Sequence, residues 1–262
     1  MNSCRKSIFI ILLFVLSGMW ILPGQAAYAQ KAKKINWGVI TIDSTWTPRG
    51  ASASHEVIAK YKPTIDSLHI VIGHSKKELV KNPPESPLSN LAADIILSQA
   101  QKYLDKKGIN ERIDMALTNF GGIRTSLPKG DISVADVLSV FPFDNRIIIL
   151  EIQGKYITRL IENFAERNRV EALSGVELVI NKHEVEKFLI GGMPVDNDKT
   201  YRLATIDFLF KGGDSVYTLK YASGAMETGI ILRDAVIDYI KNLTANGKDV
   251  DATEDARVII KK

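Results

Sequence analysis

Residues 119–145, NFGGIRTSLPKGDISVADVLSVFPFDN, carry the features that decide the fold and the candidate site. They follow a largely apolar run at residues 113–118, which is typical of a buried strand. Ser133 and Asp136 have the spacing of a capping box and predict a short helix that ends near Val140. A second apolar run at residues 146–152 predicts another strand. The segment therefore connects two predicted strands through a glycine turn, a helix and an aromatic corner.

The glycine turn has the sequence N-F-G-G-I-R at residues 119–124. Paired glycines after a strand let backbone N–H groups approach a ligand, because no side chain stands in the way. Arg124 adds a planar cation that suits phosphate or carboxylate. An ordinary turn beside a surface arginine would have the same sequence. The pattern lacks both the G-K-[ST] ending of a Walker loop and the third glycine of a dinucleotide fingerprint.

Two aromatic rings lie at predicted strand boundaries. Phe143 precedes the strand at 146–152, and Phe208 ends a strand predicted over 201–208. Phe208 is followed by a second glycine pair and by Asp214. Rings of this kind can stack on a base, and a carboxylate beside a glycine turn can accept hydrogen bonds from a sugar diol. Core packing for Phe143 and plain turn chemistry for the second glycine pair are the alternatives.

The N-terminus has the features of a secretory leader. Arg5 and Lys6 precede an uncharged run at residues 7–20, and Ala27 and Ala29 form an A-x-A pattern that predicts cleavage before Gln30. Cleavage would lower the formal charge from +4 to +2 and remove the one cysteine. Because positive and negative charges are almost balanced, the net charge does not favour nucleic acid or an anionic membrane as a partner. We expect an exported protein, periplasmic or extracellular, that depends on its core instead of disulfides.

The rest of the sequence alternates between strand and helix periodicity. Further helices are predicted over residues 56–68, where Pro63 interrupts the pattern, and over 89–108, 154–164 and 229–241. Strands are predicted over residues 35–42, 69–73, 173–181, 187–190 and 257–260. This mixture, without a repeat or a low-complexity linker, predicts one domain of mixed helix and strand, with two lobes as a variant. We expect a leader at 1–29, an extension at 30–54 and this domain at 55–262.

At these motifs the sequence resembles the C-terminal, substrate-binding domain of the 5'-nucleotidase and UDP-sugar hydrolase family. The resemblance covers roughly residues 55 to 260 and rests on several motifs in a fixed order, namely IG at 72–73, PLSNLAAD at 87–94, NFGGIR at 119–124, PFDN at 142–145, YRLA at 201–204 and FLFKGGD at 208–214. It implies a single α+β domain with a mixed sheet and flanking helices, in which two phenylalanines sandwich a nucleobase.

The resemblance also implies roles for individual residues. Phe143 and Phe208 correspond to the two rings, Asp214 to the carboxylate that takes the ribose hydroxyls, and Asn145 to a contact with the base edge. Asn119 and Arg124 correspond to the phosphate side. The expected substrate-binding residues are Asn119, Gly121, Gly122, Arg124, Phe143, Asn145, Phe208, Gly213 and Asp214.

The family hydrolyses phosphate esters at a two-metal site in a separate N-terminal metallophosphatase domain. Its motifs, D-x-H, N-H-[DE] and G-H-x-H, do not occur in this sequence, which contains four histidines. We therefore expect no catalytic residue, cofactor or metal ligand in this chain, and divalent metals on a partner chain. The sequence departs from the family pattern at two places near the expected substrate pocket. No arginine stands in PPES at 83–86, and the loop ERNRV at 166–170 is shorter than its family counterpart.

The function expected from these features is that of a nucleotide- or nucleoside-binding subunit of a split, exported 5'-nucleotidase. Its ligand would be a nucleoside 5'-monophosphate or a nucleoside, and its partner a separate metallophosphatase chain. We expect no nucleic-acid polymer as a partner and no membrane attachment after cleavage. One alternative is a non-catalytic periplasmic nucleoside- or nucleotide-binding protein. Another is a domain kept only for protein contacts.

Overall fold

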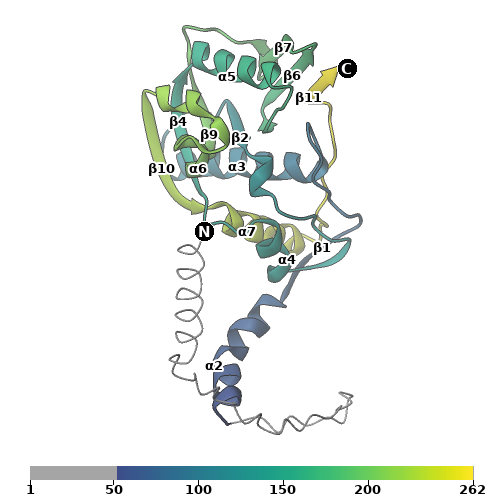
Figure 1. Cartoon of the computed structure of the whole chain (residues 1–262). Helices are drawn as coiled ribbons and strands as arrows, with labels where there is room; N and C mark the ends of the chain where they lie inside the picture. Colours follow the sequence, from purple (N-terminus) through teal and green to yellow (C-terminus); the bar gives the residue numbers. More distant parts are fainter. Residues whose placement is uncertain (1–51, 262) are drawn as a thin grey trace, which may run out of the picture. The chain divides into compact units, whose positions relative to one another are not determined.

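The computed structural model describes residues 52–261, with side chains from residue 56 onward (Figure 1). The expected leader, and the strand expected at residues 35–42, lie outside the described residues. In chain order the elements are α2 (Ser52–Leu68), β1 (Val71–Ser75), α3 (Pro87–Lys106), β2 (Met115–Thr118), η1 (Phe120–Gly122), β3 (Gly130–Ser133), α4 (Val134–Val140), β4 (Arg146–Gln153), α5 (Gly154–Glu166), β5 (Ala172–Ser174), β6 (Val176–Asn181), β7 (Glu184–Ile190), β8 (Met193–Pro194), β9 (Thr200–Ile206), α6 (Asp207–Phe210), η2 (Gly213–Ser215), η3 (Tyr217–Tyr221), β10 (Gly224–Ile231), α7 (Leu232–Ala245) and β11 (Val258–Lys261).

A five-stranded mixed sheet forms the centre of the described part. Its strand order is β10-β4-β9-β2-β5, and only the β2–β9 pair is parallel. A second mixed sheet has the order β11-β6-β7-β8, and β1 pairs with β3 in a small antiparallel ribbon. The expected α+β fold with mixed sheet and flanking helices is confirmed.

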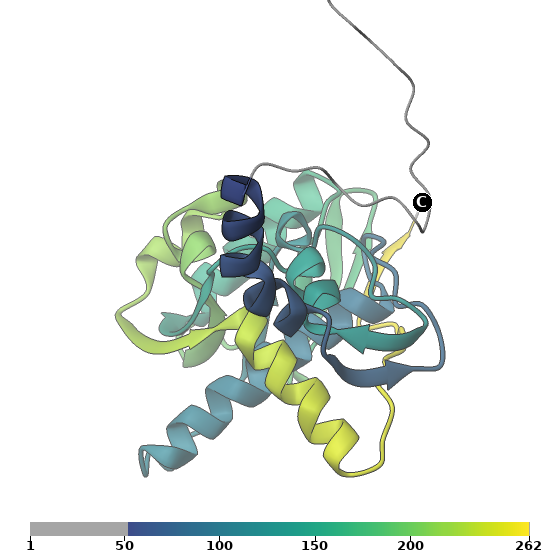
Figure 2. The ribbon, with the colours of Figure 1, turned by 90° about the horizontal axis from the view of Figure 1, so that it is seen from below.

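Both faces of the central sheet are covered. Four consecutive residues of β4, from Ile147 to Leu150, are buried, so side chains on both sides of the pleat are shielded from water. Helix α3 packs against β2, β4, β5 and β9, whereas α5 packs against β4 and β7. Helices α3 and α7 also pack against each other (Figure 2). These layers make the sheet a rigid support for the loops at its edges.

Strand directions bring four loops to the same edge of the central sheet. Because β2 and β9 are parallel, their C-terminal ends lie together, with Asn119 after one and Asp207 after the other. The antiparallel neighbours β4 and β5 begin at that same edge, since Ile147 pairs with Ile206 and Ala172 pairs with Thr118. Segments that are far apart in the sequence therefore meet there.

Local sequence signals explain several helix boundaries. The capping box predicted at Ser133 and Asp136 is present, because each residue's backbone N–H donates to the other's side chain and α4 begins directly after it. Helix α3 has a similar box at Ser86 and Ser89, followed by a proline in its first turn. In α5 the predicted apolar side chains all face the core and are buried.

Several expectations about strands and their boundaries were wrong. The strand expected over 173–181 is divided into β5 and β6 at Gly175, which has a φ of 77°. Strand β9 of the central sheet ends at Ile206, so Phe208 lies in the short helix α6 and not in a strand. Helix α7 begins at Leu232 instead of 229, because 224–231 form the edge strand β10. The strand β3 was not predicted.

Helix α2 also differs from the expectation, because it continues through Pro63. A proline inside a helix removes one backbone hydrogen bond and leaves a carbonyl without its donor. Residues 56–67 are exposed within the described part of the chain, so water can reach that carbonyl. The helix begins at Ser52, ahead of the expected domain start at residue 55. None of the helices within residues 52–261 is long and apolar enough to cross a bilayer.

Candidate functional site

A cavity of about 260 Å³ lies at the sheet edge where the four loops meet. Its lining consists of Asn119, Gly121, Gly122, Arg124, Phe143, Asn145, Phe208 and Asp214. These are eight of the nine residues expected to bind substrate, and the ninth, Gly213, lies directly behind the ring of Phe208. The structure thus brings the predicted residues together, although they come from segments up to 95 residues apart.

One hydrogen bond joins the glycine turn to the second glycine segment. The amide Nδ2 of Asn119 donates to Oδ2 of Asp214 at 2.6 Å. The side chain of Asn119 is buried, and its Oδ1 has no hydrogen-bond partner among the described residues. A buried acceptor without a donor is unfavourable by about 1–3 kcal/mol.

The glycine pair is required by the close approach of this bonded pair. A Cβ atom at Gly122 would lie 2.7 Å from Oδ1 of Asn119. A Cβ atom at Gly121 would lie 3.2 Å from the Asn119 amide and 3.3 Å from the Asp214 carboxylate. The alternative of an ordinary turn does not explain this crowding. Glycine is present because the side chains of Asn119 and Asp214 occupy the space that a side chain on the turn would fill.

The two phenylalanines line the cavity and are not part of the buried core. Phe143 is 47% exposed and Phe208 is 42% exposed, whereas Phe120 and Phe164 are buried. Apolar rings that remain half exposed at the wall of a cavity are available for a planar ligand. A Cβ atom on Gly213 would collide with the ring of Phe208, so glycine at this position lets the ring lie against the backbone.

Backbone contacts hold the loop that carries Phe143. The first N–H of α7, at Leu232, donates to the carbonyl of Asn145 at 2.9 Å, and Arg233 pairs with Asp144 at 2.7 Å. The N–H of Arg146 donates to Oδ1 of Asp207 at 3.0 Å. Since Asp207 directly precedes Phe208, this bond connects the two segments that carry the rings.

Arg124 places a positive charge at the mouth of the cavity. Its Nη1 donates to the carbonyl of Gly121 at 3.3 Å, so the guanidinium lies over its own turn. No carboxylate in the described part of the chain lies within ion-pair distance of it. A permanently charged fork in this position can receive an anionic ligand.

Two further side chains form hydrogen bonds with the backbone of the glycine turn, and no sequence motif indicates either of them. Lys81 donates from Nζ to the carbonyl of Ile123 at 2.7 Å. Glu171 is 3% exposed and accepts a hydrogen bond from the N–H of Phe120 at 2.7 Å. Burial raises the pKa of Glu171, and the negative charge of Asp214 raises it further, whereas the Phe120 N–H and Arg169 lower it. Only the pairing of β5 with β2, which brings Glu171 to the end of β2, could have identified this glutamate as a partner of the turn.

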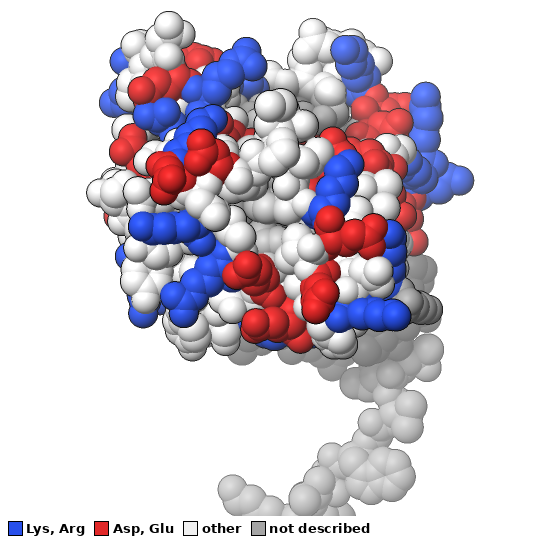
Figure 3. Space-filling model, turned by 90° about the horizontal axis from the view of Figure 1, so that it is seen from above, with Lys and Arg blue, Asp and Glu red and all other residues white. Residues whose placement is uncertain are grey.

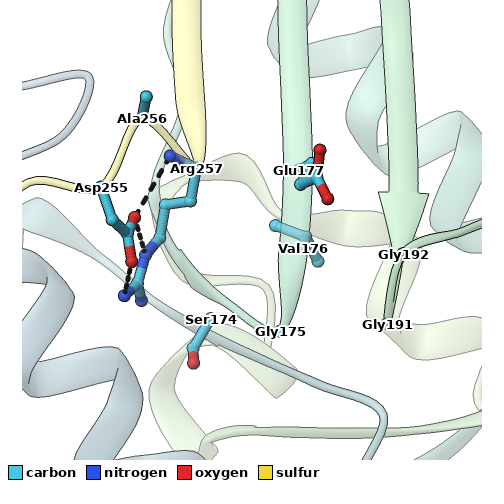
Figure 4. A pocket seen from close by; sticks show the side chains of 9 residues that line it. All are labelled: Ser174, Gly175, Val176, Glu177, Gly191, Gly192, Asp255, Ala256 and Arg257. Atoms are coloured by element: carbon cyan, nitrogen blue, oxygen red, sulfur yellow. Dashed lines mark hydrogen bonds and ion pairs between the residues drawn. The ribbon is translucent and has the colours of Figure 1, made fainter.

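A larger cavity of about 440 Å³ lies elsewhere, between the β6–β7 hairpin and the start of β11 (Figure 4). Arg257 projects into this region, but its guanidinium is bound by Asp94 and Asp255 at 2.5 Å and 2.7 Å. Two carboxylates outweigh the one guanidinium, so Arg257 has no positive charge left over for an anionic ligand. None of the residues expected to bind substrate lines this cavity.

Neither the charges on the face drawn in Figure 3 nor the metal-binding types of side chain within residues 52–261 indicate a second site. Basic and acidic side chains are interspersed over the face seen from above (Figure 3). Within residues 52–261, no three histidine, cysteine, aspartate or glutamate side chains converge as a metal site would require. His74 lies in β1, and its Nδ1 is 3.3 Å from Asp249.

Comparisons with known proteins agree with this arrangement. The chain is similar to Protein UshA of Escherichia coli, with 34% identity over 132 residues, which are 49% of this chain and 24% of UshA. It is 30% identical over 189 residues to the trifunctional nucleotide phosphoesterase protein YfkN of Bacillus subtilis, covering 66% of this chain and 12% of YfkN. The matches thus span a quarter or less of these relatives.

A solved structure also resembles this chain over only part of its own length. The crystal structure of a 5'-nucleotidase precursor from Thermus thermophilus matches with a TM-score of 0.66 and 29% identity, over 79% of this chain and 43% of that chain. Among the family profiles, that of the 5'-nucleotidase C-terminal domain matches residues 71–221. That range contains every residue that lines the cavity and covers more than half of the sequence. The chain therefore belongs to the 5'-nucleotidase C-terminal domain family.

Proposed function

We propose that this chain is the nucleotide-binding component of an exported, split 5'-nucleotidase-type phosphohydrolase. The observation that carries the proposal is the convergence of two half-exposed rings, one carboxylate and one arginine on a single cavity. Each of these groups suits one part of a nucleotide. The leader-like N-terminus supports export.

The chemistry of the lining suggests where each part of a nucleoside monophosphate binds. The base stacks between Phe143 and Phe208, and the side chain of Asn145 meets its edge. Asp214 accepts hydrogen bonds from the ribose hydroxyls, and Arg124 pairs with the phosphate. All these positions line the same cavity, so one ligand can reach them together.

Asn119 keeps the place on the phosphate side that the resemblance implied. Its Nδ2 group carries two hydrogens, and one of them goes to Asp214. The amide can therefore still donate to a phosphate oxygen of a bound nucleotide.

The hydrolytic step is assigned to a separate metallophosphatase chain. A two-metal site needs several carboxylate and imidazole ligands, and the lining of the cavity has one carboxylate and no histidine. The donor set of this cavity therefore does not fit such a site. The contribution of this chain would be to hold the ester so that a metal-bound oxygen on the partner can reach phosphorus.

The test is an assay of both chains, separately and mixed. We expect release of phosphate from AMP only when this chain, an exported metallophosphatase and a divalent metal are all present. Co-purification of the two chains gives an independent measure of the complex. Phosphate release by this chain alone, at an enzyme-like rate and in the presence of chelator, would contradict the assignment of the chemistry.

A non-catalytic nucleoside- or nucleotide-binding protein is the second candidate function. The same cavity supports it, because no residue of the lining has an assigned catalytic role. The two candidates differ in one observable. A binding protein would retain nucleotide affinity and would not increase the turnover of any exported metallophosphatase tested with it.

Replacing Arg124 by alanine should weaken AMP and leave adenosine nearly unchanged. We expect a loss of about 1 kcal/mol, roughly fivefold, because the guanidinium is exposed and partly screened by salt. Calorimetry with both ligands measures the difference. Arg112→Ala is the matched control, since Arg112 is exposed and precedes β2, away from the cavity. Equal losses for AMP and adenosine would contradict a phosphate role.

A further inference from the structure

One backbone N–H at the end of the central sheet has a side chain as its acceptor. The pairing of Ile147 with Ile206 places Arg146 of β4 opposite Asp207, the first residue of α6. In an antiparallel ladder, a hydrogen-bonded pair exchanges its N–H and carbonyl groups. Here the carbonyl of Asp207 accepts from the N–H of Lys211 at 3.0 Å, because the chain turns into α6. The N–H of Arg146 would therefore be left to water.

The carboxylate of Asp207 supplies this acceptor. Its Oδ1 accepts from the N–H of Arg146 at 3.0 Å, and its Oδ2 accepts from Nζ of Lys211 at 2.9 Å. The strand geometry agrees, because the carbonyl of Ile147 accepts from Thr228 of β10, so the N–H one residue earlier faces β9. Burial raises the pKa of Asp207, but Lys211 and the Arg146 N–H outweigh this and lower the pKa below its ordinary value. The side chain therefore accepts as a carboxylate at neutral pH.

This hydrogen bond lies between two segments of the cavity wall. Arg146 directly follows Asn145, and Asp207 directly precedes Phe208, and both of these neighbours line the cavity. Phe143, the second ring of the wall, stands shortly before Arg146 in the same loop. A movement of one segment against the other would change the gap between the rings. A bond at this place therefore bears on the stacking of a planar ligand.

We propose that Asp207 is a positioning residue of the nucleoside site, whose carboxylate fastens the loop that carries Phe143 to the helix that carries Phe208. The inference rests on the proposed function in calling the cavity a nucleoside site. Loss of the bond would remove no contact with the ligand, since Asp207 does not line the cavity. It would leave the separation of the two rings free to vary, and ligand binding would then have to order them.

Substitutions of Asp207 separate the acceptor from the charge. Asp207→Ala removes the acceptor, whereas Asp207→Asn keeps an oxygen at the same reach and removes the charge. Calorimetry with adenosine should show about a five- to tenfold loss of affinity for the alanine variant and affinity within about twofold of the wild type for the asparagine variant. Asp207→Ser keeps a polar group without its reach and should lose as much as alanine. An asparagine variant as weak as the alanine variant would overturn the proposal.

Lys211→Ala is the matched control, because it removes the other partner of the same carboxylate. The side chain of Lys211 is 73% exposed, and an exposed ion pair contributes little. This variant should therefore bind adenosine within about twofold of the wild type. A loss as large as that of Asp207→Ala would assign the effect to the ion pair and contradict the proposal.

A double-mutant cycle tests whether Asp207 acts through the rings. Asp207→Ala should weaken adenosine in the wild-type background and have less than about a twofold effect in the Phe143→Ala background, because a single ring has no partner to be aligned with. Equal effects in both backgrounds would mean that Asp207 acts on the cavity by another route, and the proposal would be wrong.

A measurement without ligand keeps the inference separate from the proposed function. Hydrogen exchange of the Arg146 amide should be slow in the wild type and in Asp207→Asn, and faster in Asp207→Ala, because only the alanine variant lacks the acceptor. If the amide exchanges equally fast in the wild type and in Asp207→Ala, the bond is absent and the inference fails. If the rates differ and the wild type binds no nucleoside, the bond stands and the proposed function fails.

Discussion

Replacing Phe208 by alanine is expected to weaken adenosine and AMP by the same factor. One stacking contact between a base and an aromatic ring contributes about 1–3 kcal/mol, which is roughly five- to 150-fold in affinity. The loss should be shared by both ligands because the ring contacts the base and not the phosphate. Calorimetry with both ligands measures it. The melting temperature should change little, because the ring is half exposed and lies outside the buried core.

Phe188→Ala is the matched control for this substitution. Phe188 lies in β7, is partly buried against the core and does not line the cavity. Its truncation should lower the free energy of unfolding while affinity for adenosine stays unchanged. An unchanged affinity in the Phe208 variant would remove the stacking site. A loss restricted to AMP would assign Phe208 to the phosphate and contradict the proposed orientation.

The second large effect is expected from Asp214→Asn. A hydrogen bond to a charged group contributes about 1.5–3 kcal/mol, so adenosine should bind roughly tenfold to 150-fold more weakly. The variant keeps the shape of the side chain and an oxygen that can still accept from Asn119. Binding of 2',3'-dideoxyadenosine should remain within about twofold of its binding to the wild type, because that ligand lacks the 2'- and 3'-hydroxyls that Asp214 would accept from.

The contrast between these two ligands is the decisive measurement for Asp214. Equal losses for adenosine and the dideoxy compound would mean that the substitution deforms the cavity instead of removing a sugar contact. Asp198→Asn provides the control for a change of charge, since Asp198 is exposed and does not line the cavity. It should bind both ligands as the wild type does.

Most of the candidate site was predicted from the resemblance to the 5'-nucleotidase family, and local patterns contributed only its turns. The glycine pair at 121–122 and the carboxylate after the second glycine pair are signals of turns next to strands. The exposure of the two rings could not be predicted from local patterns. Nothing local distinguishes Phe143 from a core phenylalanine such as Phe164, and only its half-exposed position on the cavity wall does so.

The supporting residues could not be predicted, since each acts across a distance in sequence. Glu171 meets Phe120 over 51 residues, and Asp207 meets the N–H of Arg146 over 61. No motif connects these pairs, because strand register and not spacing decides which residues become neighbours. The edge strand β10 was missed for a related reason, as it lies at the sheet margin and its side chains are exposed or only half-buried.

By itself, the sequence determined the mixture of helix and strand, the capped helix α4, the buried faces of α3 and α5, and the turns that carry the candidate ligand contacts. These depend on periodicity, caps and glycine, which act within a few residues. Only the tertiary structure decided that the turns meet at one sheet edge, that Asn119 binds Asp214, and that Glu171 accepts a hydrogen bond from the Phe120 N–H. The parallel pairing of β2 with β9 and the antiparallel pairing of β4 and β5 place these groups together, and pairing is a property of the whole sheet.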